Sequence, residues 1–140
     1  GQMEGYVTEQ FFFFSYPYAY DKVQMFIKAV KETWAKLPVQ IIESRFNIIG
    51  VNGLHEDAVD IPPAEELNQR SELGLRIALK HKDDRTGKTA IAGIVCLGLN
   101  GPPGVISVPG WGNMNRAMLS LWPTLIPREL ITQEIKFVNV

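Results

Sequence analysis

The segment ELGLRIALK at residues 72–80 restricts the fold of this chain more than any other feature. Leucine or isoleucine occupies every second position from Leu73 to Leu79, and the charged Arg76 and Lys80 lie between or beside them. Because side chains alternate between the two faces of a β-strand, the pattern predicts a strand with one apolar face. Such a strand requires partner strands and a layer that covers this face.

Three further segments have strand patterns. Residues 6–16 are rich in β-branched and aromatic side chains, and phenylalanines fall on both faces of the predicted strand. We therefore expect both faces of this strand to be covered. Residues 39–51 and 131–140 alternate well enough to predict two more strands.

Two segments have helix patterns. In residues 21–37 apolar side chains recur at offsets of three and four, with Asp21 as a plausible N-cap and Pro38 as the end. Residues 89–99 predict a shorter helix after a turn and caps in residues 82–88, although so apolar a run is also compatible with a strand.

The order of these elements predicts an α+β fold. The sequence β, α, β, β, α, β matches the split βαβ, ferredoxin-like arrangement (βαββαβ), with an antiparallel sheet and two helices on one face. Residues 54–70 are acidic and contain Pro62 and Pro63, which predicts a long loop with one helical turn at residues 64–68. We expect a second copy or a further domain to bury the opposite face of the sheet.

Size and charge limit the classes of function. The chain has 140 residues, and we expect one domain over residues 3–140. Its 14 basic and 15 acidic side chains form no long block of one sign, so we expect neither nucleic acid nor a membrane as a partner. The absence of a spanning or signal segment and of a cysteine pair predicts a cytoplasmic protein. Cys96 lies in an apolar run, and we expect it to be buried and unreactive.

Residues with catalytic or metal-binding chemistry do not form a recognised motif. The acidic segment LHEDAVD offers His55, Glu56, Asp57 and Asp60, but their spacing matches neither a zinc nor a calcium pattern. We therefore expect a solvated loop, with no metal and no cofactor. His81 lies among charged residues and is expected at the surface. The candidate nucleophiles lie outside any nucleophile elbow and beside no evident histidine; they are Ser15, Ser107, Ser120 and Cys96.

The segment NGPPGVISVPGWGN at residues 100–113 is rich in glycine and proline. Phosphate-binding loops precede a helix, whereas this segment follows one, so a phosphate site is not favoured. Asn100 and Gly101 instead predict a left-handed end of the preceding helix, and Pro102 and Pro103 prevent its continuation.

Several short motifs, taken in order, resemble a known family. They are EGYVTEQ, FNIIGVNGLH, ELGLRIALKHKD, LNGPPG and LWPTLIPREL. Together they resemble the C-terminal part of the conserved region in the acyclic terpene utilization family, whose members are linked to degradation of citronellol and geraniol type terpenoids. The sequence departs from the family where Pro103, Val105 and Ile106 interrupt the usual run of glycines.

The resemblance implies a C-terminal domain that packs on a larger N-terminal domain or on a second copy. It provides no catalytic residues. For ligand contacts we single out Asn100, Gly101 and Gly104 in the glycine-rich loop, together with Arg128, whose guanidinium could bind a carboxylate or phosphate. The alternatives are a self-contained oligomeric α+β barrel, acting as an enzyme or small-ligand binder with an apolar pocket, and a pure interaction domain.

Overall fold

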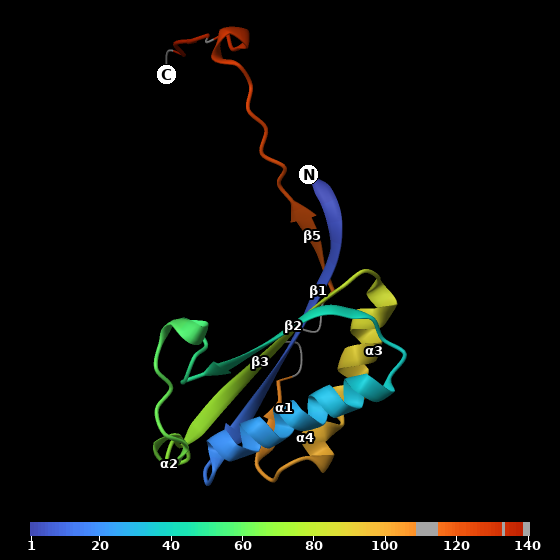
Figure 1. Cartoon of the computed structure of the whole chain (residues 1–140), viewed down its shortest axis with the longest axis vertical. Helices are drawn as coiled ribbons and strands as arrows, with labels where there is room; N and C mark the ends of the chain where they lie inside the picture. Colours follow the sequence, from blue (N-terminus) through green and yellow to red (C-terminus); the bar gives the residue numbers. More distant parts are fainter. Residues whose placement is uncertain (109–114, 133, 139–140) are drawn as a thin grey trace.

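The computed structural model describes residues 1–108, 115–132 and 134–138 (Figure 1). Its strands are β1 (Gln2–Ser15), β2 (Ile41–Ile49), β3 (Glu72–His81), β4 (Val105–Ser107) and β5 (Arg116–Ser120). Its helices are α1 (Ala19–Lys36), α2 (Ala64–Leu67), α3 (Asp84–Val95) and α4 (Leu97–Asn100), with the 3-10 turns η1 (Glu56–Ala58) and η2 (Arg128–Leu130). The α+β class is confirmed.

The strands form one antiparallel sheet in the order β2-β3-β1-β4. β5 pairs with β1 as well, toward the N-terminal end of β1. β1 is therefore the central strand, with β3 along one edge and the two short strands β4 and β5 along the other. β2 lies at the edge of the sheet.

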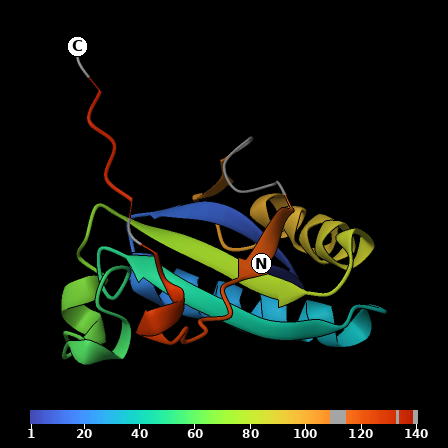
Figure 2. The ribbon, with the colours of Figure 1, turned by 90° about the horizontal axis from the view of Figure 1, so that it is seen from above.

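The hydrophobic core lies between one face of the sheet and helices α1 and α3, and α1 is seen beneath the strands in Figure 2. Phe12 and Phe14 of β1 are fully buried, and their rings lie 4.6 and 5.3 Å from that of Phe26 in α1. The predicted alternation of β3 is confirmed, since its leucines and isoleucine are buried in this core. Trp34 of α1 donates to the Ala90 carbonyl at 3.0 Å and so joins the two helices.

The first predicted helix is present, but it begins earlier than predicted and has a different cap. α1 begins at Ala19, so Asp21 lies in its first turn, and the prediction that Asp21 is the N-cap is wrong. Asp21 instead pairs with Asn68 at the end of α2: Asn68 Nδ2 donates to Asp21 Oδ2 at 2.8 Å, and Asp21 N donates to Asn68 Oδ1 at 3.0 Å. This pair attaches the predicted long loop, including its helical turn, to α1.

The second long helix begins earlier than expected. Residues 84–88 continue α3 rather than form a turn, because Asp83 is the N-cap and accepts from Thr86 N at 2.9 Å. Thr86 Oγ1 donates to the same carboxylate at 2.7 Å. This cap holds the pKa of Asp83 below its usual range, mainly through the two Thr86 donors.

The predicted final strand is wrong in the part that the structure describes. Residues 131, 132 and 134–138 form no strand, whereas residues 133, 139 and 140 lie outside the described residues. The edge of β1 that a last strand would need is already paired with β4 and β5. The exact ferredoxin-like topology therefore stays a prediction.

Candidate functional site

An open groove of about 700 Å³ lies between α3, α4 and β4. We call it the α3–β4 groove. Most of its wall is apolar, and this part consists of Ile91, Ala92, Val95, Leu99, Val105 and Ile106. Its polar lining consists of Thr8, Lys88, Cys96, Ser107 and Asn115. Its volume lies within the range of small-molecule sites.

A chain of contacts places three of the polar groups at one end of the groove. Thr8 Oγ1 donates to Asn115 Oδ1, and Asn115 Nδ2 donates to the Asp84 carbonyl at 2.8 Å. Asp84 in turn forms an ion pair with Lys88 in the first turns of α3. The Lys88 and Asn115 donors hold the pKa of Asp84 below its usual range. The groove thus combines an apolar wall with a polar, cationic end.

His81 supports this polar end from inside the protein. The prediction that it lies at the surface is wrong, because it is the last residue on the buried face of β3 and is fully buried. Its Nε2 lies 2.8 Å from Thr8 Oγ1, and its Nδ1 lies 2.7 Å from the Asp83 carbonyl oxygen. These two contacts fix the orientation of the His81 ring between β1 and the start of α3.

Gly87 allows α3 to approach these groups. A Cβ at this position would overlap His81 Nε2, Asn115 Oδ1 and Thr8 Oγ1. The polar end of the groove therefore depends on a residue without a side chain at the fourth position of α3.

The groove contains two groups that the sequence offers as nucleophiles. Cys96 is exposed, so the prediction that it is buried is wrong: it follows the last residue of α3 and lines the groove. In the part of the chain that the structure describes, no hydrogen bond joins Cys96 or Ser107 to a histidine.

The glycine-rich loop connects two walls of the groove. Asn100 is the last residue of α4, and Gly104 immediately precedes β4. The helix stops where the sequence predicts, but Gly101 is extended rather than left-handed, with φ −88°. The left-handed residue is Gly104, at φ 79°, and its carbonyl oxygen accepts from Ser15 N at 3.0 Å. Residues 109–113 lie outside the described residues.

Arg128 lies far from this loop. It begins η2 near the end of the chain, at the opposite end of the long axis from α4 (Figure 1). The structure therefore does not bring Arg128 together with Asn100, Gly101 and Gly104.

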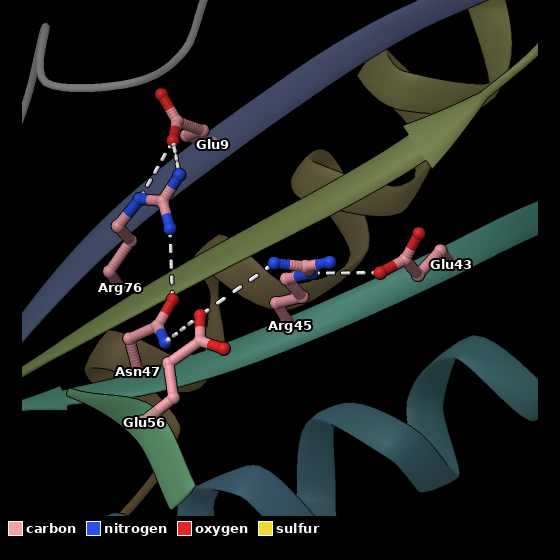
Figure 3. A network of polar contacts seen from close by, with 6 residues as sticks. All are labelled: Glu9, Glu43, Arg45, Asn47, Glu56 and Arg76. Carbon is pink, nitrogen blue, oxygen red and sulfur yellow. Dashed lines mark hydrogen bonds and ion pairs between the residues drawn. The ribbon is translucent and has the colours of Figure 1, made fainter. Parts of the chain in front are cut away.

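A second polar group lies on the face of the sheet away from the helices (Figure 3). Glu9 is almost fully buried, and its carboxylate accepts from Arg76 Nε at 2.7 Å and pairs with Arg116 of β5. Arg76 Nη1 also donates to Asn47 Oδ1 at 2.9 Å, which extends the network to β2. These side chains pair with one another, so the network links β1, β2, β3 and β5.

The acidic loop joins the same network instead of forming a centre of its own. Glu56 Oε1 accepts from Asn47 Nδ2 at 3.3 Å and lies 3.7 Å from Arg45 Nη1. His55 and Asp60 are exposed, and the side chain of Asp57 lies outside the described part. Among the described residues, no three His, Cys, Asp or Glu side chains gather where they could hold a metal ion. The described helices also include none long and apolar enough to cross a membrane.

The fold and the groove together define a small α+β domain with an apolar channel that is polar at one end. The family model described as "Acyclic terpene utilisation family protein AtuA" matches residues 1–137, and the chain belongs to this family. No curated protein and no solved structure matches the chain.

Proposed function

We propose that this domain binds the acyclic, branched chain of a terpenoid acid or alcohol in the α3–β4 groove. The observation that carries the proposal is the division of the groove into an apolar wall and a polar end at Thr8, Lys88 and Asn115. A hydrocarbon chain gains about 25 cal/mol for each Å² that it buries against such a wall. Family membership supports an acyclic terpenoid as the ligand.

The polar end favours an acidic head group. Lys88 presents an ammonium group at the mouth of the groove, where a carboxylate would compete with Asp84 for it. The loop from Asn100 to Gly104 joins α4 to β4 and would set the width of the apolar end. The loop residues would therefore affect ligand binding indirectly, by setting the distance between α4 and β4.

The test is calorimetric titration of the purified protein with geranic acid and with geraniol. We expect Val95→Lys, which places a charge in the apolar wall, to weaken binding of both ligands at least tenfold. Met25→Lys is the matched control, because Met25 is an exposed apolar residue of α1 that does not line the groove. Binding that is equal in the two variants would refute the groove as the site.

A second pair of measurements tests the polar end. Lys88→Met is expected to weaken binding of geranic acid about tenfold and to leave geraniol binding within twofold, because only the acid carries a charge. Equal loss for both ligands would contradict an acid-binding role of Lys88.

The proposal includes a macromolecular partner, which is either the larger domain of a longer protein or a second copy of this chain. It is supported by the apolar side chains that residues 121–132 and 134–138 expose. The domain would then hold its ligand as part of an assembly.

A further inference from the structure

The C-terminal segment, residues 121–132 and 134–138, exposes its apolar side chains, and we call it the C-terminal arm. Leu125 is 99% exposed, Phe137 93% and Trp122 75%. The hydrogen bonds and ion pairs of its described residues run within the arm itself. Figure 1 shows the arm leaving the end of β5 and running away from the body of the protein. Exposed apolar side chains in such a concentration mark an interaction surface.

The outer edge of β2 can accept a further strand. No described strand pairs with this edge, and the middle of β2 is exposed. At Ile48 the outward backbone groups are already used, since its N–H donates to Asn52 Oδ1 at 2.8 Å and its carbonyl oxygen accepts from Val51 N and Asn52 N. The open part of the edge therefore ends before Ile48. Since the direction of backbone groups alternates along a strand, the backbone groups of Ser44 and Phe46 also point outward. An open edge of this kind is a template for another chain.

The end of the arm complements this edge in charge. An antiparallel alignment that places Glu134 opposite Arg45 also places Lys136 opposite Glu43. Directly opposed residues of opposite charge stabilise an antiparallel pair. The side chains of Glu43 and Arg45 are both more than half exposed and form an ion pair with each other at 2.8 Å, so an added strand would bring its charges to an exposed ion pair.

The same alignment also determines which face of the sheet the apolar side chains of the arm would occupy. Ile135 falls opposite Ser44 on the helix-covered face of β2, whereas Ile131 falls opposite Ile48, beyond the open part of the edge. A shift by one residue would move every apolar side chain of the arm to the other face. One register therefore places opposite charges across from each other and directs Ile135 to the helix-covered face.

We propose that two copies of this chain exchange their C-terminal arms, each arm adding an antiparallel strand to the β2 edge of the other copy. The arm leaves its own body, and both complementary surfaces belong to one sequence, so a two-fold dimer uses each surface twice. The inference rests on the partner part of the proposed function and not on the ligand groove. It specifies that the macromolecular partner is a second copy of this chain.

A disulfide across the proposed register tests the exchange. Arg45→Cys and Glu134→Cys are combined with Cys96→Ser, so that only the two new thiols remain. Opposed Cα atoms of a pair without mutual hydrogen bonds lie about 4.5 Å apart, which suits a disulfide. We expect a covalent dimer on non-reducing gels, and a covalent heterodimer when the two single-cysteine proteins are mixed. Arg45→Cys with Lys136→Cys is the control for register and should link at least tenfold less.

Other outcomes would overturn the proposal. A disulfide within one chain would show that the arm closes on its own sheet. A monomer without a disulfide would show that the arm binds elsewhere, as on a larger domain. None of these measurements uses a ligand, so they are independent of the groove.

Charge reversal provides a second readout by sedimentation velocity. Arg45→Glu should weaken dimerisation about tenfold, because each dimer contains the contact twice. Adding Glu134→Arg should restore it. Arg128→Glu, also on the arm but outside the proposed strand, is the matched control and should have less than a twofold effect.

Discussion

Substitution of Gly87 by alanine tests whether α3 packs against the polar end of the groove as described. The added Cβ would overlap Thr8 Oγ1, Asn115 Oδ1 and His81 Nε2, and His81 is fully buried. Disrupting the Thr8–His81 hydrogen bond while both groups stay buried costs about 1–3 kcal/mol. Alanine gains up to about 1 kcal/mol over glycine within a helix. We expect a net loss of about 1–2 kcal/mol in the free energy of unfolding.

Gly93→Ala on the same helix is the matched control. A Cβ there would meet the end of the flexible Leu37 side chain, which can move away. The helical gain should then dominate, and the variant should be as stable as the parent or more stable by up to about 1 kcal/mol. The same glycine-to-alanine change is thus expected to have opposite signs at two positions of α3.

Urea denaturation followed by tryptophan fluorescence measures both variants. Thermal unfolding should place Gly87→Ala about 3–8 °C below the parent, from the size of the domain. In a Thr8→Ala background the cost of Gly87→Ala should fall, since one of the overlapping atoms is removed. A Gly87→Ala protein as stable as Gly93→Ala would refute the described packing.

Three further substitutions have defined outcomes. Gln10→Met should raise the free energy of unfolding by about 1 kcal/mol, because the buried Gln10 Oε1 has no hydrogen-bond partner among the described residues; a loss of stability in urea denaturation would contradict this. Glu9→Gln should lower it by about 1–3 kcal/mol, less than for a fully buried pair because Arg76 is partly exposed; Glu4→Gln, whose side chain is half-exposed, is the control and should change little. Asp83 has a lowered pKa, so its contribution is present above the ordinary aspartate pKa of about 4 and is lost as the pH falls through the folded value. Asp83→Asn keeps the cap and should be less sensitive to pH in thermal unfolding below pH 4; an unchanged acid dependence would exclude this role.

Most of the fold could be predicted from local patterns. Alternation identified β1, β2 and β3, and the helical period identified α1, because long elements with one covered face carry a repeated signal. β4 and β5 were missed, since strands of three and five residues are too short to show a period. For residues 131–140 the error is the reverse, since a strand was predicted where the described residues form none. Alternation indicates that a segment can form a strand, but it does not indicate whether a partner strand is available.

The candidate site was less predictable. His81 continues the alternation of Leu73 to Leu79, and this pattern alone predicts that His81 is buried. The charged residues next to it in the sequence suggested an exposed position instead. Alternation along β1 puts Thr8 on the same face as Phe12, and both side chains are buried. The groove itself could not be read from the sequence, because it exists only where β4 and α4 meet α3, and Thr8 and Asn115 are 107 residues apart.

The central position of β1 has a consequence for how the chain is synthesised. β1 emerges first from the ribosome and contains the run Phe11 to Phe14, yet it pairs with β3, in which Ser15 meets Glu72 and Tyr6 meets His81. These partners are 57 and 75 residues away, so at about 5–20 residues per second the phenylalanines wait roughly 3–15 s for β3. During this time the nascent chain exposes its most aggregation-prone segment, and its yield in cells should depend on chaperones that shield the first strand until the third has been made.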